Sequence, residues 1–180
     1  IAGFQYKEDA ERYYALLKER LKKFNLELEE SKSRMIEFGK YAEINSKRKY
    51  GRKAETFNFL GFTLYCGKSR HSGEFCVKLK TNSKKFTQKL KQTKEWLYQN
   101  NDLPVKDLIT RLNKKLVGHY RYYGVSHNIN KLSAFLHYVQ RYLFKVLNRR
   151  SHKKSYTWDG YIDMLKVYPL AKPKIYVKLF

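Results

Sequence analysis

Apolar residues recur at spacings of three and four along much of this 180-residue chain, and that period predicts amphipathic helices. We expect one helix over residues 7–25, three over about residues 83–150, and a short one from Trp158 to Val167. The apolar stripes of the three central helices are Phe86, Leu90, Thr93 and Leu97; Val105, Leu108, Ile109, Leu112 and Leu116; and Leu132, Phe135, Leu136, Val139, Leu143 and Val146. Three such helices with short connections predict a small bundle.

The ends of the second central helix carry recognisable signals. Asn101 or Asp102 is expected to cap it, and Pro104 fits its first turn, where a missing N–H costs nothing. Gly118 is expected to end it. The stretch LVGHYRYYGVSHN, residues 116–128, would then turn the chain at Gly124 towards the third helix.

Strand-like patterns occur before the bundle. Residues 55–81 predict two strands, with Gly67 and Gly73 on either side of the turn between them. Residues 1–4 are expected to form a short strand, and residues 26–39 a turn between two short strands. The basic run KRKYGRK, residues 47–53, is expected to be a loop.

These elements predict an α+β fold in three parts. A small part with short antiparallel strands and a helix covers about residues 1–81. A three-helix bundle covers residues 83–150, and a basic tail covers residues 151–180.

The net charge of the chain indicates what kind of partner it binds. The chain holds 39 Lys and Arg against 16 Asp and Glu, a formal charge of +23. Residues 1–30 hold six basic and seven acidic residues, so the positive charge lies almost wholly in residues 31–180. Because so large a charge opposes compaction by self-repulsion, we expect a polyanionic partner.

Sixteen tyrosines and 11 phenylalanines accompany these cations. Cations for phosphates and flat rings for bases together favour single-stranded or irregular RNA. We expect the tyrosines after Gly118 to be divided, one or two packed between helices and the others facing RNA beside Arg121. The candidate nucleic-acid-binding residues are Lys47, Arg48, Lys49, Arg52, Lys53, Lys68, Arg70, Lys114, Lys115, His119, Tyr120, Arg121, Tyr122, Tyr123, Arg149, Arg150, Lys153 and Lys154.

No complete catalytic or metal site is expected. The chain has no phosphate-binding glycine loop and no nucleophile-elbow motif. Asp159 and Asp163 are spaced like two metal ligands, but no third acidic residue is near, so the exposed first turn of a helix is the favoured interpretation. Cys66 and Cys76 have only His71 nearby, too few ligands for zinc. They favour two reduced thiols on neighbouring strands of an intracellular protein.

The sequence shows no apolar run of 18 residues and no signal peptide. The apolar start without an initiator methionine leads us to expect that the chain begins inside a larger protein.

Five segments in order resemble the C-terminal half of bacterial group II intron reverse transcriptases, also called maturases. They are FQYKEDAERYYALLKERLKKFNLEL, SKSRMIEFG, ETFNFLGFTLYCGKSR, LVGHYRYYGV and LNRRSHKKSYTW. The resemblance implies that residues 1–81 are the end of the polymerase palm and residues 83–150 the thumb, or maturase-specific domain X. Residues 151–180 would be the start of the DNA-binding region.

The resemblance also implies roles for particular residues. Phe59, Leu60, Gly61 and Phe62 would form the primer grip, and Lys32 would be a candidate general acid beside the pyrophosphate leaving group. Ser33 stands where the family commonly has threonine. The aspartates that hold Mg²⁺ would precede Ile1, so we expect the parent protein to be an RNA-directed DNA polymerase and this chain to be inactive alone.

The expected partners are group II intron RNA, a template–primer duplex and, through the tail, target DNA. The expected setting is a nucleoid-associated ribonucleoprotein in the bacterial cytoplasm. A stand-alone basic RNA-binding module is the alternative. A nuclease is disfavoured, because the histidines lack acidic partners at usable spacing. The sequence leaves open which RNA is bound and whether the chain dimerises.

Overall fold

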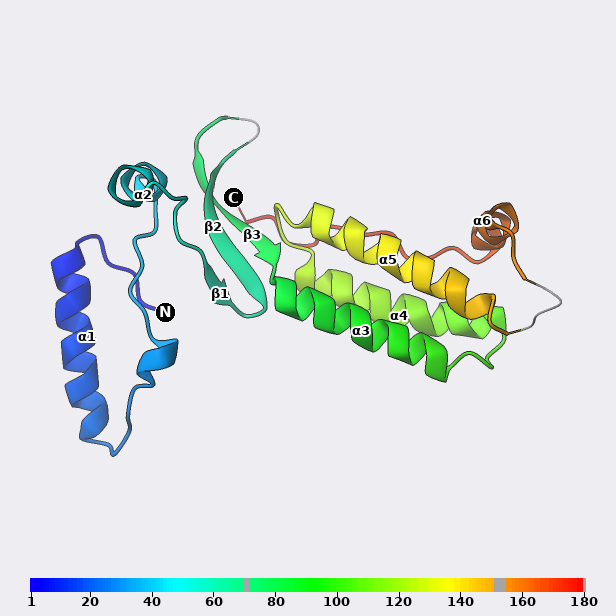
Figure 1. Ribbon diagram of the computed structural model, residues 1–180, viewed down its shortest axis with the longest axis horizontal. Coiled ribbons are helices and arrows are strands. Elements are labelled where there is room, and N and C mark those ends of the chain that lie inside the picture. Colours follow the sequence, from blue (N-terminus) through cyan, green and yellow to red (C-terminus); the bar gives the residue numbers. More distant parts are fainter. Residues whose placement is uncertain (70–71, 151–154, 180) are drawn as a thin grey trace. The chain divides into compact units, whose positions relative to one another are not determined.

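The computed structural model describes residues 1–69, 72–150 and 155–179, and it divides the chain into two compact units, residues 1–55 and 56–180 (Figure 1). We expected the strands of residues 55–81 to group with the segment before them. Their contacts group them instead with the helices that follow.

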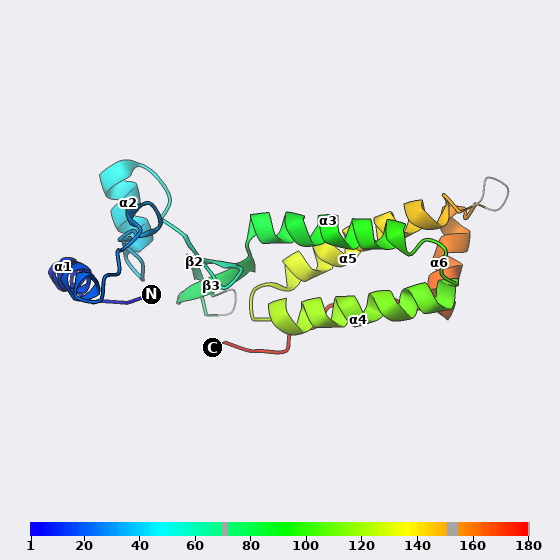
Figure 2. The same cartoon turned by 90° about the horizontal axis from the view of Figure 1, so that it is seen from below.

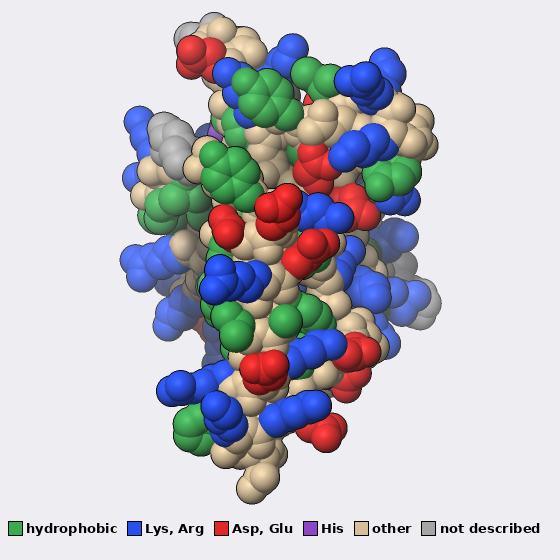
Figure 3. All heavy atoms as spheres, turned by 90° about the vertical axis from the view of Figure 1, so that its left-hand side faces the viewer, with side chains coloured by type: hydrophobic (Ala, Val, Ile, Leu, Met, Phe, Trp, Pro, Cys, Tyr) green, Lys and Arg blue, Asp and Glu red, His purple; other side chains and the backbone are tan. Residues whose placement is uncertain are grey.

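The first unit contains α1 (Lys7–Lys22), the 3-10 helix η1 (Glu30–Lys32) and α2 (Ala42–Tyr50). The helix expected over residues 7–25 is confirmed, although α1 buries none of its residues. Acidic and basic side chains are interspersed over it (Figure 3). An ion pair joins Lys18 to Glu30 at 2.5 Å, and this hydrogen bond raises the pKa of the lysine and lowers that of the glutamate.

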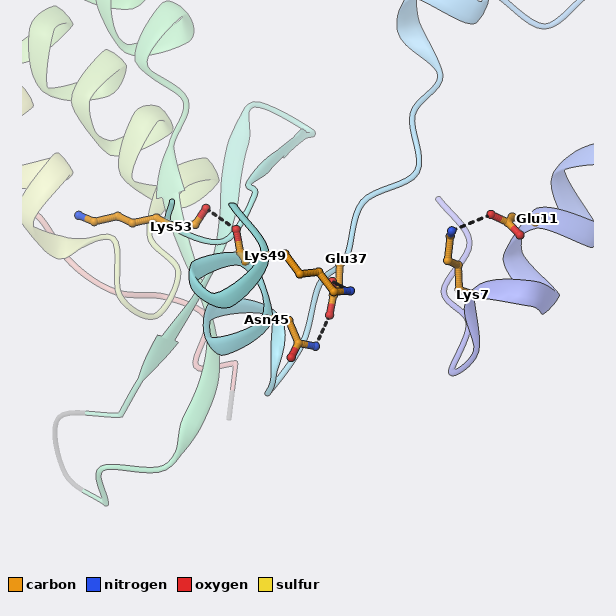
Figure 4. A network of polar contacts seen from close by, with 7 residues as sticks. Lys7, Glu11, Glu37, Asn45, Lys49 and Lys53 are labelled. Carbon is orange, nitrogen blue, oxygen red and sulfur yellow. Dashed lines mark hydrogen bonds and ion pairs between the residues drawn. The ribbon is translucent and has the colours of Figure 1, made fainter. Parts of the chain in front are cut away.

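Polar contacts between side chains organise the rest of this unit (Figure 4). Glu37 accepts a hydrogen bond from Asn45 and lies 3.8 Å from the Lys49 ammonium. The buried Ser46 hydroxyl donates to the backbone oxygen of Lys53 at 3.1 Å. These bonds hold α2 against the chain on both sides of it.

Three predictions for this unit are wrong. Residues 1–4 form no strand, and the turn expected within residues 26–39 is present as η1 but lacks flanking strands. A strand needs a hydrogen-bonded partner, and residues 1–55 contain no strand. Residues 47–50 of the expected loop at 47–53 are the end of α2, which stops before Gly51 in the left-handed region with φ of 64°.

The second unit begins with a three-stranded antiparallel sheet, β1 (Phe57–Phe59), β2 (Phe62–Lys68) and β3 (Phe75–Thr81), in the order β1-β2-β3. The hairpin predicted over residues 55–81 is confirmed as β2 and β3, and β1 is an additional strand. A two-residue turn joins β1 to β2, with φ of 46° at Leu60 and 78° at Gly61. Positive φ at both positions is the turn that matches strand twist in a hairpin.

The helices α3 (Ser83–Gln99), α4 (Val105–Tyr123) and α5 (Ile129–Leu147) lie side by side in both views (Figures 1 and 2). The fourth, α6 (Trp158–Val167), crosses the end of this bundle away from the strands. The apolar residues of the predicted stripes belong to the core or pack against it, and Thr93 is also buried. Leu97, Leu108, Leu112, Leu132, Val139, Leu143 and Val146 are 0% exposed.

The predicted ends of α4 are wrong. Pro104 itself is the N-cap residue, and no side chain caps the helix. The helix continues through Gly118 to Tyr123, and Gly124 follows it. A single glycine inside a helix costs about 1 kcal/mol relative to alanine, which the buried stripe of α4 outweighs.

The tail returns along α4. Leu170 is buried, and Asn113 on α4 bonds to the tail on both sides of it, donating to the Pro169 oxygen and accepting from the Ala171 N–H. Tyr176 and Val177 then both donate backbone hydrogen bonds to the Gly124 oxygen, at 2.7 and 3.0 Å. The tail after α6 is therefore extended and is part of the second unit.

Candidate nucleic-acid interface

The strands and the bundle meet at a polar junction centred on Asn82, the residue between β3 and α3. Its side chain accepts hydrogen bonds from the backbone N–H groups of Lys84 and Lys85, which caps α3. The same side chain donates to Asn58 on β1 at 2.8 Å, and its backbone N–H donates to the Gly61 oxygen at 2.9 Å. The β1–β2 turn is thus fixed to the start of α3.

Asn128 makes a second, fully buried link. Its oxygen accepts the backbone N–H of Thr81, and its amide donates to the Thr81 hydroxyl and to the Tyr123 oxygen, each at 2.8 Å. This residue is 1% exposed. One amide therefore ties the end of β3 to the end of α4 and the start of α5.

Two tyrosines of α4 hold the β1–β2 turn from the other side. The Tyr122 ring stacks on Phe62 with 6.0 Å between centroids, and its hydroxyl donates to the Leu60 oxygen at 2.9 Å. Tyr123 meets Phe62 edge-on at 5.2 Å. A Cβ on Gly61 would lie 3.0 Å from the Tyr123 hydroxyl, a tight contact, and the φ of 78° itself favours glycine at this position.

His119 and Tyr120 are buried, at 5% and 1% exposed. Burial, together with the charge of Lys89, lowers the pKa of His119 to about 4, and burial raises the pKa of Tyr120. Both side chains are buried in the free chain, and their contact with RNA stays a prediction. Tyr120 is the tyrosine packed between helices, Tyr123 is half-buried, and Tyr122 is exposed.

The remaining predicted cations lie in different places. Those of residues 47–53 are exposed in the first unit, and Lys68 is exposed at the end of β2. Lys114, Lys115 and Arg121 are exposed on α4. Arg149 is exposed and Arg150 half-buried at the end of α5, where Arg150 donates to Asn101 at 3.1 Å. Arg70, Lys153 and Lys154 lie outside the described residues.

The residues resembling a primer grip form the β1–β2 turn. Phe59 and Leu60 are 46% and 66% exposed, and Phe62 is buried beneath them. Lys32 lies in η1 and is exposed in the other unit.

Aromatic rings beneath the lysines and arginines are the part of this surface that the sequence reasoning missed. The Lys115 ammonium lies 4.8 Å from the centre of the Trp96 ring, and the Arg149 guanidinium lies 5.2 Å from that of Tyr98. Lys94 lies 5.9 Å from the same Tyr98 ring, at a spacing of four residues on α3, which was readable from the sequence. The Trp96 pair joins α3 to α4, and the Arg149 pair joins α3 to the turn after α5, so both could be found only from the fold.

Across residues 1–69, 72–150 and 155–179, no three His, Cys, Asp or Glu side chains come together in an arrangement that could hold a metal. Asp163 forms an ion pair with Lys166 at 2.8 Å. Cys66 pairs with Val77 and Cys76 with Gly67, so the two free thiols lie on neighbouring strands, as expected, but on opposite faces.

No helix in the described parts of the chain combines the length and the apolar composition that crossing a bilayer requires.

The bundle and its cationic surface define a small basic helical domain with a β hairpin docked at one end. Residues 83–161, from α3 into α6, match the family model of the group II intron maturase-specific domain. The match supports a group II intron maturase C-terminal region and links the chain to intron splicing. Neither the curated proteins nor the solved structures gave a match.

Proposed function

We propose that this chain binds group II intron RNA and so supports splicing of that RNA. The match of residues 83–161 to the maturase-specific domain is the observation that carries the proposal. The same residues hold 17 Lys and Arg against four Asp and Glu. A surface of that charge favours a phosphate backbone, and the rings of Trp96 and Tyr98 beneath its cations suit unpaired bases.

We further propose that the β1–β2 turn contacts a template–primer duplex during RNA-directed DNA synthesis by a bacterial parent protein. Leu60 supports this because it is 66% exposed and has φ of 46°. A left-handed backbone costs a residue other than glycine about 1–2 kcal/mol. A strained leucine that adds nothing to the core is expected where its side chain serves a ligand.

The same proposal assigns the Mg²⁺ and the catalytic aspartates of DNA synthesis to the parent polymerase, and target-DNA binding to the tail. The ribonucleoprotein would act at the bacterial nucleoid. These assignments rest on the resemblance of residues 1–82 and 151–180, which lie largely outside the matched domain.

The binding proposal is tested by titrating the chain with a group II intron RNA and with an unrelated structured RNA of equal length, at increasing salt. Roughly 6–10 phosphate contacts predict a ~10³–10⁵ loss of affinity between about 50 and about 200 mM salt. Tighter binding of the intron supports the proposal. Equal binding of both RNAs favours a stand-alone basic module, and a salt-independent affinity contradicts both.

A further inference from the structure

A groove of about 400 Å³ lies between α3 and α4. Its lining combines apolar residues such as Leu116 and Phe135 with polar residues from both helices. Concave sites of this kind, mostly apolar with a few fixed polar groups, are where small rigid groups bind.

Gly118 lies on the wall of this groove, in the middle of α4. A glycine there destabilises the helix, so a compensating reason is expected. Packing does not supply one, because a Cβ at this position would meet no heavy atom within 4 Å. What the glycine leaves instead is bare helix backbone facing open space, which a flat group can approach closely.

The next residue, His119, also lines the groove and is 5% exposed. Its ring stacks on Phe135 with 3.9 Å between centroids, and neither ring nitrogen has a hydrogen-bond partner in the structure. A buried polar group without a partner costs free energy that a ligand would recover by bonding to it. With its lowered pKa the imidazole is neutral at pH 7, so it offers one donor and one acceptor.

The rim of the groove carries positive charge and amide groups. Lys89 and Gln92 are exposed on α3, and Lys115 is exposed on α4. The exposed Tyr122 completes the rim beside the β1–β2 turn. Lysines can hold a phosphate while an amide reads the polar edge of a base, the pairing of groups that unpaired RNA needs.

We propose that this groove binds one unstacked nucleobase of single-stranded RNA, with its phosphate between Lys89 and Lys115. The flat face lies against Gly118, and the polar edge reaches Gln92 and His119. Because the His119 nitrogens are buried in the free chain, the side chains over them must move aside as the base enters. This inference rests on the proposed RNA binding and adds a base-binding position to it.

The test uses the full chain and the substitution Gly118→Ala. A methyl group there improves helix propensity, so the Tm rises by about 2–6 °C. The same methyl occupies the path of the base, so affinity for a short single-stranded RNA falls, by up to the about fivefold to hundredfold that one stacked base contributes. Gly118→Leu fills more of the groove and weakens binding further. A higher Tm with weaker binding cannot arise from a purely structural role.

Thr110→Ala is the matched control, because Thr110 is exposed on the same helix and does not line the groove. It should raise the Tm and leave RNA binding unchanged. The second arm replaces the RNA by one with abasic sugars, which keeps the phosphates. The wild-type chain should bind it at least about fivefold more weakly, and the Gly118→Leu chain should distinguish the two RNAs less than the wild-type chain does.

Wild-type affinity in both Gly118 variants, or equal binding of normal and abasic RNA, would overturn the groove assignment while leaving RNA binding intact. Failure of the wild-type chain to bind any RNA would overturn the proposed function and this inference together.

Discussion

At the scale of single residues, the buried imidazole of His119 makes stability depend on pH. Its pKa is lowered to about 4 in the folded chain, against about 6.5 unfolded. The unfolded state therefore binds more protons between these values, and this stability is present above pH 6.5 and is lost as pH falls towards 4.

Urea unfolding should therefore show a free energy of unfolding about 2 kcal/mol lower at pH 5 than at pH 7 through this residue alone. His119→Leu removes the ionisation, so the difference between the two pH values should shrink by that amount. An unchanged pH dependence in the variant would show that another group is responsible.

Removing the side-chain amide of Asn128 should cause a large loss of stability. Asn128→Ala leaves the Thr81 N–H and the Tyr123 oxygen without partners in a buried site, so we expect about 2–4 kcal/mol of destabilisation in denaturant unfolding. Asn130→Ala, an exposed position on the same turn of α5, should change stability by less than about 0.5 kcal/mol. Similar effects of the two substitutions would contradict the role assigned to Asn128.

Residue-scale roles were the hardest to predict. The sequence of residues 116–128 showed a concentration of aromatic and basic side chains. It could not show what these side chains pack against, because their neighbours in space come from the strands and from α5. Tyr122 could not be assigned from sequence, because Phe62 and Leu60, which fix it, are about sixty positions away.

At the scale of elements, the periodicity of apolar residues was sufficient to predict most helices. The stripes of α3, α4 and α5 and the bounds of α6 were predicted correctly, since each helix buries a face long enough to dominate its sequence. The wrong predictions concerned elements that depend on a hydrogen-bonded partner strand or on the backbone conformation of a single residue. Gly118 looked like a helix end, but the end lies at Gly124, where the tail docks.

Alanine substitutions at Gly118, inside α4, and at Gly124, just after it, should have opposite effects on stability. A Cβ at Gly124 would clash with the Tyr120 backbone oxygen in α4 and would lie 2.6 Å from the Lys174 backbone oxygen in the tail, whereas one at Gly118 would touch nothing. Gly124→Ala should therefore displace the tail and cost about 1–3 kcal/mol. Hydrogen exchange at the Tyr176 and Val177 amides reports the displacement, and Gly118→Ala is the control in which these amides stay protected. Unchanged protection in Gly124→Ala would contradict the tail contact.

At the scale of the whole molecule, the two units differ in how much they bury. The main apolar cluster lies entirely within residues 56–180, while α1 buries nothing. The composition predicted a difference in net charge along the chain but not this difference in burial. Which segments share a core depended on contacts such as those of Asn82 and Asn128, which no local pattern reveals.

This difference predicts two levels of hydrogen exchange. Amides of α4 and α5 should exchange only with global unfolding of their unit, whereas α1 amides should exchange by local opening with little protection. Mass spectrometry on peptides from the intact chain measures both. Equal protection of α1 and α5 would show that α1 has a covering partner that the chain supplies elsewhere.

The docking of Tyr176 and Val177 on Gly124 has a consequence for synthesis on the ribosome. The corner between α4 and α5 is completed by residues made some fifty positions later. During translation the bundle can gather its apolar stripes while that corner stays open, and it closes only when the tail has left the exit tunnel. The nascent chain would thus present the Gly124 edge to chaperones until Tyr176 and Val177 emerge.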